Sequence, residues 1–117
     1  MPRKAIDYLK TIMYKFVCND LHILDTYVGH TTDFTKRKAS HKSRCENEND
    51  KKHNLKIYKI IRENGGWNNW SMIEIEKYPC AGGNEATTRE RHWYEELNAK
   101  MNSNVPSRLI AECILHG

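Results

Sequence analysis

Six side chains spread along the chain are of the kinds that phosphodiester hydrolysis requires. They are two phenols, a guanidinium, an imidazole, a carboxylate and a carboxamide, and they belong to Tyr14, Tyr27, Arg37, His41, Glu90 and Asn102. Such hydrolysis needs a group that helps to deprotonate a water molecule, a cation at the phosphate and a carboxylate for a divalent metal ion. Hard oxygen ligands and phosphate both favour Mg²⁺. The set is therefore a candidate hydrolytic site, provided that the fold brings its members together.

The two tyrosines lie on segments that predict a β-hairpin. In residues 12–18, IMYKFVC, β-branched and aromatic side chains dominate one face, which predicts a strand. The turn-forming stretch NDLH follows, and a second strand is expected over about residues 23–28, ended by Gly29. If the turn is centred within NDLH, Tyr14 faces Tyr27 directly across the pair. A one-residue slip would separate the two phenols, so this expectation depends on the turn.

Arg37 and His41 lie on a segment that predicts a helix. Thr32 or Asp33 can cap its N-terminus, and no Gly or Pro interrupts the helix until about Cys45. Because Arg37 and His41 are four residues apart, their side chains are neighbours on the helix surface. The expected inward stripe has Arg37 at its margin and comprises Phe34, Lys38, His41 and Cys45.

The rest of the chain predicts one more strand and two more helices. A helix over about residues 54–63 has three isoleucines on its apolar side and ends at NGG, and a strand follows within residues 69–78. A third helix, about 84–100, has an apolar stripe with one acidic member, Glu90. A carboxylate in a buried stripe is costly unless a cation or hydrogen bonds compensate it. A structural partner such as Arg37 or Arg89 could do so, and the alternative is a metal ion.

Basic residues gather in one part of the chain. Residues 36–62 contain ten Lys or Arg and three acidic residues, whereas the whole chain has a formal net charge of only +4. Such a patch suits a polyanion such as nucleic acid, although it could also be a solvated face.

Cysteine usage and hydropathy bear on the cellular setting. The four cysteines form no Cys-x-x-Cys pair and the first ten residues lack the apolar core of a signal peptide, so an intracellular protein with free thiols is expected. A zinc site that combines cysteines with His41, His53 or His92 would lack paired ligand spacing. No stretch approaches the about 20 apolar residues that a membrane-spanning helix needs, so no membrane partner is expected.

Taken in order, these motifs resemble the GIY-YIG nuclease family. The two motifs that name the family correspond to IMY at 12–14 and YVG at 27–29. The essential arginine of the family lies eight residues past the second motif's glycine, as Arg37 lies past Gly29. Some members carry a histidine or tyrosine four residues after that arginine, where this chain has His41.

The resemblance continues in the last predicted helix. The family's metal-binding glutamate is followed 12 residues later by an asparagine, which matches Glu90 and Asn102. The match covers about residues 11–104. Ile12 replaces the usual Gly of the first motif, and the turn between the motifs is a few residues longer than in compact members. Neither difference removes a reacting group, since Gly at that place offers only backbone freedom.

The family's fold is α+β, with a central three-stranded antiparallel sheet flanked by helices. It implies a single domain over residues 1–117, with its core at about 11–104 and a C-terminal extension at 105–117. The segment after Asn102 could add a short helix, or it could mark where a longer parent protein was cut.

The family's mechanism implies a role for each candidate. Glu90 would hold Mg²⁺ or Mn²⁺, and Arg37 would bind the non-bridging phosphate oxygens. Tyr14 would accept the proton of the attacking water, Tyr27 would hydrogen-bond in the same pocket, and His41 would assist or relay the proton. An ordinary tyrosine has a pKa of about 10, so this role for Tyr14 needs a stabilised phenolate.

The implied activity is metal-dependent cleavage of DNA. The DNA backbone would be contacted by basic side chains after the second motif, which are His30, Lys36, Arg37, Lys38 and Lys42. Gly29 and Asn102 would support the site, Asn102 by fixing a loop rather than by reacting. The size of the chain leaves little room for a specificity module, so a dimer or a further domain elsewhere is possible.

Other interpretations remain open at this point. The tyrosines could be a stabilising cross-strand pair, Arg37 a surface cation and His41 an ordinary helix residue. The protein could then be a nucleic-acid-binding module that keeps the fold without catalysis. An acidic residue in the apolar stripe of the last helix favours the nuclease, because binding alone does not require it.

Overall fold

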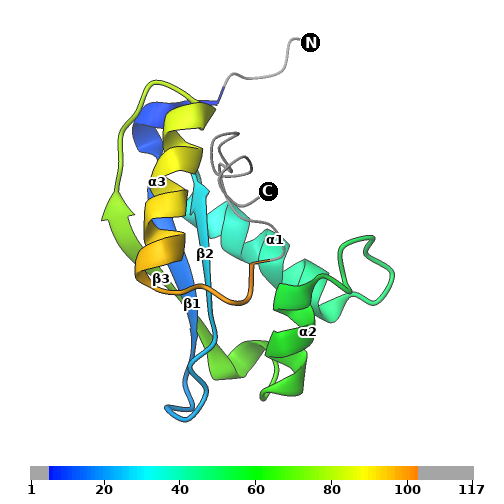
Figure 1. Cartoon of the computed structure of the whole chain (residues 1–117). Coiled ribbons are helices and arrows are strands. Elements are labelled where there is room, and N and C mark those ends of the chain that lie inside the picture. The colour runs from blue at the N-terminus through cyan, green and yellow to red at the C-terminus, as the bar shows by residue number, and fades with distance from the viewer. Residues whose placement is uncertain (1–5, 103–117) are drawn as a thin grey trace, which may run out of the picture.

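The computed structural model describes residues 6–102 (Figure 1). Its elements, in chain order, are η1 (Tyr8–Lys10), β1 (Ile12–Cys18), β2 (Thr26–Thr31), α1 (Phe34–Glu46), α2 (Lys56–Glu63), η2 (Trp67–Asn69), β3 (Trp70–Lys77) and α3 (Gly83–Glu96). The expected α+β class with a three-stranded antiparallel sheet and flanking helices is confirmed. The extension expected at 105–117 lies outside the described residues.

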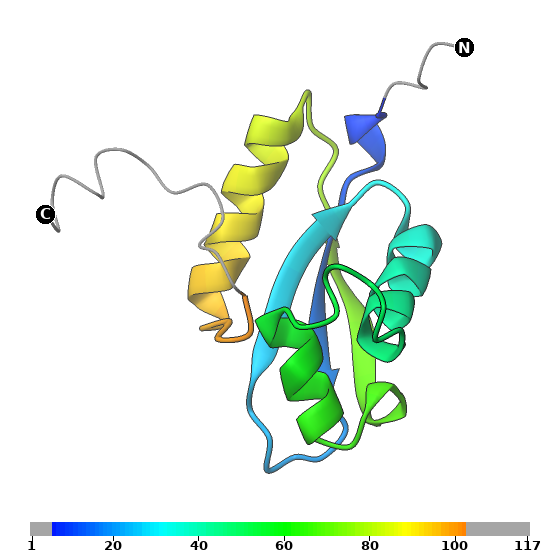
Figure 2. The same ribbon diagram turned by 90° about the vertical axis from the view of Figure 1, so that its right-hand side faces the viewer.

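The sheet has β1 in the centre, with the strand order β2-β1-β3 and antiparallel pairing on both sides. Figure 2 shows α3 on one face of the sheet and α1 with α2 on the other. Because side chains of a strand alternate between faces, β1 contributes to two separate apolar layers. Among the described helices, none is long and apolar enough to span a membrane.

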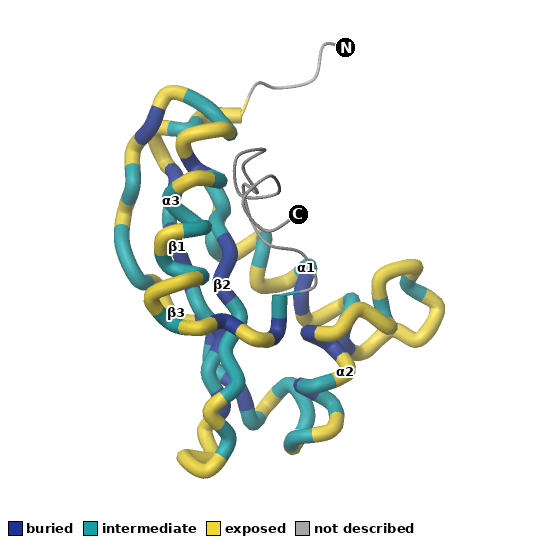
Figure 3. The backbone as a smooth tube through the Cα atoms, in the orientation of Figure 1, coloured by how far each residue is buried: buried dark blue, intermediate teal, exposed yellow. Residues whose placement is uncertain are grey.

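The larger core lies between the sheet and the α1–α2 pair. It contains alternate residues of β1 and the inward faces of both helices, including Tyr14, Phe16, Cys45, Tyr58 and Ile61. A smaller cluster, built around Met13, Cys80 and Ala86, lies beneath α3. Figure 3 shows the buried segments running along β1 and β2. The central strand therefore positions side chains for both layers at once.

The register of the hairpin differs from the expected one by two residues. Tyr14 lies opposite Gly29, and Tyr27 lies opposite Phe16, so the prediction that the two tyrosines face each other directly is wrong. A two-residue shift preserves the face on which each side chain lies. The rings of Tyr14 and Tyr27 consequently remain neighbours along a diagonal, with centroids 6.3 Å apart.

The second strand was expected at about 23–28, but β2 runs from Thr26 to Thr31 and Gly29 lies inside it. The physical reason is a close approach between the two strands. A Cβ atom on Gly29 would lie 2.5 Å from the hydroxyl oxygen of Tyr14. Gly29 thus makes room for the Tyr14 side chain and does not end the strand.

The first helix is close to its prediction. Asp33 is the N-cap of α1, and its carboxylate accepts a hydrogen bond from the backbone N–H of Lys36. His41 and Cys45 are buried as expected, but Lys38 is exposed and Arg37 is half-buried. The inward stripe therefore includes Arg37 in place of Lys38.

The other two helices are shorter than predicted. Helix α2 begins at Lys56 rather than near residue 54, and it buries Tyr58 beside its isoleucines. Helix α3 ends at Glu96 rather than near Lys100, and Asn98 after it has a positive φ of 51°. Asn is among the non-glycine residues that adopt this left-handed conformation most readily. The last residues of the expected helix therefore turn back toward β2.

Candidate active site

Tyr14 is the centre of the candidate site. Its side chain is fully buried, and its hydroxyl lies 2.7 Å from Nε2 of His41. Arg37 Nε donates a longer hydrogen bond of 3.4 Å to the same hydroxyl oxygen. Tyr27 packs against both the Tyr14 ring and the His41 ring. The hairpin and α1 thus bring together four of the six residues named at the start.

The two phenols are held in their neutral form. Burial is the main reason that the pKa of Tyr14 lies well above its ordinary value, and the nearby Tyr27 adds to the effect, while Arg37 opposes it. Burial and then the charge of Glu90 raise the pKa of Tyr27. A phenolate at Tyr14 therefore needs more stabilisation than Arg37 supplies alone.

His41 is a neutral imidazole inside this cluster. Burial, followed by the charges of Arg37 and Arg44, lowers its pKa to about 3. With Nε2 bonded to Tyr14 and only 1% of the residue exposed, His41 has no contact with bulk solvent that would favour its charged form. It acts on Tyr14 by hydrogen bonding rather than by charge.

Arg37 is the cation of the cluster. Burial works against its charge, but the adjacent phenols of Tyr14 and Tyr27 outweigh that effect and raise its pKa. The side chain is half-buried, so one end contacts Tyr14 while the guanidinium remains within reach of a ligand. A planar guanidinium of this kind is suited to the oxygens of a phosphate.

Glu90 and His30 form a hydrogen bond at the edge of the site. Glu90 Oε1 lies 2.8 Å from His30 Nδ1, and the Glu90 side chain is only 16% exposed. The sequence suggested a structural partner such as Arg37 or Arg89 for Glu90, and the partner in the structure is His30 instead. Arg89 instead binds Glu76, through Nε and through Nη2 at 2.9 Å. Because His30 lies on β2 and Glu90 on α3, their pairing joins these two elements.

Glu90 is linked to the tyrosines by its charge, since it raises the pKa values of both Tyr14 and Tyr27. Within residues 6–102, no group of three or more His, Cys, Asp or Glu could hold a metal ion. The described residues therefore contain no such group that combines a cysteine with His41, His53 or His92, as a zinc site would require. Combinations with Cys113 lie outside the described residues. A single carboxylate still fits Mg²⁺, which commonly keeps several waters and binds through one or two carboxylates together with substrate phosphates.

Asn102 lies beside β2 and contacts its backbone. Its carboxamide oxygen accepts a hydrogen bond of 3.0 Å from the N–H of Val28, and its nitrogen donates one of 2.8 Å to the Val28 carbonyl. The N–H of Met101 bonds the carbonyl of Thr26 in addition. Asn102 therefore fastens the segment after α3 to β2, and within residues 6–102 no hydrogen bond joins its side chain to Tyr14, Tyr27, Arg37 or His41.

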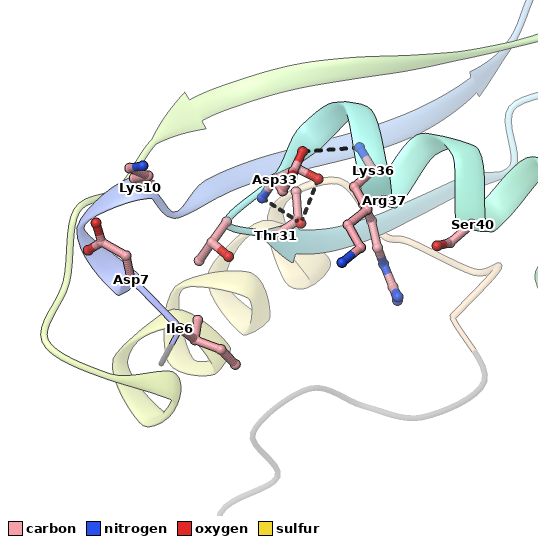
Figure 4. Close-up of a pocket in the computed structure, with 9 residues that line it drawn as sticks. Ile6, Asp7, Lys10, Thr31, Asp33, Lys36, Arg37 and Ser40 are labelled. Atoms are coloured by element: carbon pink, nitrogen blue, oxygen red, sulfur yellow. Dashed lines mark hydrogen bonds between the residues drawn. The ribbon is translucent and has the colours of Figure 1, made fainter. Parts of the chain in front are cut away.

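An open pocket of about 450 Å³ lies beside the cluster, and Arg37 lines it. The other lining residues include Lys10 and Lys36, two aspartates and hydroxyls from β2 and α1. Figure 4 shows Lys36 and Arg37 extending from the same side of α1. Lys38 and Lys42 are exposed but do not line this pocket. The two tyrosines and Glu90 are also absent from its lining, so Arg37 alone connects it to the cluster.

Tyr58 was not among the residues chosen from the sequence. Its hydroxyl lies 2.8 Å from Nδ1 of His41, on the side of the imidazole opposite Tyr14. Burial raises the pKa of Tyr58, with Arg44 acting in the opposite direction. The signal was present in the helical spacing, because Tyr58 precedes the buried Ile61 by three residues and shares its face.

Comparison with known proteins agrees with this geometry. A family model described as the GIY-YIG catalytic domain matches residues 10–104, which confirms the resemblance seen in the motifs. No curated protein and no solved structure gave a significant match to the chain.

Proposed function

Because the chain belongs to the GIY-YIG catalytic domain family, whose members are nucleases, we propose that it is a metal-dependent endonuclease that hydrolyses DNA. The observation that carries this proposal is the contact of Arg37 with the hydroxyl of Tyr14, inside a buried cluster that also contains His41 and Tyr27. Hydrolysis of a phosphodiester needs a phosphate-binding cation beside a group that can handle the proton of a water molecule.

Arg37 is suited to bind and orient the scissile phosphate. Its Nε is directed at the Tyr14 oxygen, so the terminal nitrogens remain for the non-bridging phosphate oxygens. A phosphate held there would lie close to the Tyr14 hydroxyl. This placement is what an in-line attack by water requires, because positioning supplies much of the acceleration in phosphoryl chemistry.

Tyr14 is proposed to accept the proton of the attacking water, with Tyr27 beside it. The neutral His41 can donate from Nε2 to the Tyr14 oxygen, and Arg37 already donates from Nε. Two donors on one oxygen favour its negative form. Burial opposes that form, so the cluster needs a further positive charge during catalysis.

Glu90 is the residue proposed to hold Mg²⁺ or Mn²⁺. A carboxylate has two oxygens, so Glu90 could keep its bond from His30 on Oε1 and present Oε2 to a metal ion. A bound ion would offset the charge of Glu90 beside the two phenols and the charge of the scissile phosphate. His30 would then orient Glu90, in addition to the phosphate contact proposed for it.

The DNA backbone is proposed to follow the basic face of α1. Lys36 and Lys10 line the pocket beside Arg37, where a phosphate next to the scissile one could bind. Lys38 and Lys42 are proposed to contact the backbone on the outer side of the same helix. Hydroxyl groups of Thr31 and Ser40 in the pocket are further donors for phosphate oxygens.

The test is incubation of plasmid DNA with Mg²⁺ or Mn²⁺, beside the variant Glu90→Ala. The natural protein should cut the DNA and the variant should not, and chelation of the metal should stop the reaction. Glu96→Ala is a matched control, because Glu96 is an exposed carboxylate on the same helix. Cutting by Glu90→Ala at the natural rate would refute the role of Glu90.

The different-class alternative is a nucleic-acid-binding module without catalysis. It predicts that DNA binding is retained while no metal ion supports cutting under any condition. Under this alternative, Tyr14→Phe and Arg37→Ala would change affinity only. Under the proposed function, both variants lower the rate of cutting by at least about a hundredfold, because each removes a group that acts in the transition state.

A further inference from the structure

Three buried side chains form one continuous line of hydrogen-bonding groups. The Tyr58 hydroxyl lies 2.8 Å from His41 Nδ1, and His41 Nε2 lies 2.7 Å from the Tyr14 hydroxyl. None of the three residues is more than 1% exposed. The line runs from α2 through α1 to β1, so the three principal elements of the larger core meet in it.

A neutral imidazole has one N–H donor and one acceptor nitrogen, and each phenol has one proton. Two arrangements of protons are therefore compatible with the distances. In the first, Tyr14 donates to Nε2 and His41 donates from Nδ1 to Tyr58. In the second, Tyr58 donates to Nδ1 and His41 donates from Nε2 to Tyr14.

The surroundings of Tyr58 distinguish the two arrangements. Arg44 lies near its hydroxyl, and an arginine only donates, so the hydroxyl hydrogen is directed away from it. Within the described part of the chain, His41 Nδ1 is the only acceptor that forms a hydrogen bond with that hydroxyl. In the first arrangement the Tyr58 proton would be buried without an acceptor, which is costly. In the second arrangement His41 Nδ1 accepts the Tyr58 proton and the Tyr14 oxygen accepts the His41 proton. The Tyr14 proton is then directed at the hydroxyl oxygen of Tyr27, which interacts with Tyr14, so every donor in the line has an acceptor.

We propose that Tyr58 is a positioning residue whose hydroxyl donates to His41 Nδ1 and so holds the imidazole as the Nε2–H tautomer. His41 then donates to the Tyr14 oxygen, which also accepts from Arg37 Nε. In the opposite tautomer, the lone pair of Nε2 would face the Tyr14 oxygen and repel any negative charge on it. The catalytic part of this inference rests on the proposed function, but the tautomer does not.

The tautomer can be measured directly by ¹⁵N NMR of the imidazole in the metal-free, DNA-free protein at neutral pH. We expect His41 Nε2 to carry the proton and Nδ1 to resonate as an unprotonated nitrogen that accepts a hydrogen bond. In Tyr58→Phe, the Nδ1 resonance should move to that of a nitrogen without a hydrogen bond. Tyr94→Phe is the matched control, because it also removes a phenolic hydroxyl but lies on α3, outside the line.

Kinetics give the second measurement. Tyr58→Phe should lower kcat for metal-dependent DNA cleavage by about five- to tenfold, as expected when a hydrogen bond that supports a charged oxygen is weakened. KM should stay unchanged, since Tyr58 does not contact the substrate. Tyr94→Phe should change neither parameter.

The outcomes separate this inference from the proposed function. An Nδ1–H tautomer in the natural protein, or a natural kcat in Tyr58→Phe, would overturn the role of Tyr58 even if Glu90-dependent cleavage occurs. If the Nε2–H tautomer is found and moves as expected in Tyr58→Phe, the tautomer assignment holds even in a protein that cuts no DNA.

Discussion

At the scale of single residues, His41 should make the protein sensitive to acid. Its pKa is about 3 in the folded chain, whereas an unfolded histidine titrates near its ordinary value of 6.5. Above pH 6.5 the His41 side chain is neutral in both the folded and the unfolded chain, so its protonation does not affect folding there. As the pH drops toward 3, the unfolded chain binds a proton that the folded chain does not, and the folding stability falls. The loss should reach about 4–5 kcal/mol, because each pKa unit corresponds to about 1.4 kcal/mol.

Urea denaturation between pH 7 and pH 4 measures this effect. The slope of stability against pH should become shallower in His41→Gln, which cannot be protonated. His22→Gln should keep the natural slope, because His22 is exposed on the hairpin loop. A natural slope in His41→Gln would mean that another group controls the acid sensitivity.

The role of Gly29 is steric. A Cβ atom there would lie 2.5 Å from the oxygen and 2.6 Å from Cζ of Tyr14, whose side chain is fully buried. Gly29→Ala should therefore cost about 1–3 kcal/mol of folding stability, as overpacking does. It should also lower cleavage at least about tenfold, because the Tyr14 hydroxyl is displaced.

Gly82→Ala is the control for this experiment. A Cβ atom at Gly82 would meet nothing within 4 Å, so Gly82→Ala adds no steric clash. Gly82 is the N-cap of α3, where Ala is less favourable than Gly, so the stability should fall by less than about 1 kcal/mol. Equal thermal midpoints for Gly29→Ala and the natural protein would contradict the steric role of Gly29.

At the scale of elements, sequence patterns predicted which segments form strands and helices better than where they pair. The two-residue error in the hairpin came from the connection between Cys18 and Thr26, which is longer than a tight turn and so does not fix the register by itself. Gly29 was interpreted as a strand end, because the sequence alone does not reveal that a tyrosine ring lies opposite. The face of each tyrosine was still predicted correctly, since strand periodicity survives a two-residue shift.

In the candidate site, neighbours within one helix could be predicted from the sequence, whereas contacts between distant elements could not. Arg37 and His41 could be placed as neighbours because helix geometry alone fixes their spacing. The partner of Glu90 could not be predicted in this way, because His30 and Glu90 meet only where α3 packs on β2. Tyr58 was missed because the isoleucines of α2 were taken as its whole apolar side.

The attachment of the segment after α3 to β2 gives the prediction at this scale. Asn102→Ala leaves the buried N–H and carbonyl of Val28 without their partners, which should cost about 1–3 kcal/mol. Hydrogen exchange at the Val28 amide should accelerate accordingly. Asn84→Ala, at an exposed position of α3, should leave that amide protected. Unchanged exchange in Asn102→Ala would show that other contacts hold this segment.

At the scale of the whole molecule, the charge distribution decides how DNA would bind. The excess of basic residues over 36–62 is spread over α1, the following loop and α2, and Figure 1 shows that this loop projects away from the sheet. Lys36, in contrast, lines the pocket beside Arg37. A DNA strand that passes through the site should therefore depend on Lys36 more than on the lysines of the loop.

Salt dependence of binding provides the test of this distribution. Each phosphate contact contributes about 0.9 to the slope of log affinity against log salt concentration. Lys36→Ala should lower that slope by about one for a duplex in Ca²⁺ or EDTA, where cutting is suppressed. Lys51→Ala, at an exposed position of the loop, removes the same charge and should change the slope less. Equal effects of the two substitutions would contradict this prediction. They would indicate that the DNA lies along the whole basic region, because only then would each lysine contribute equally to the slope.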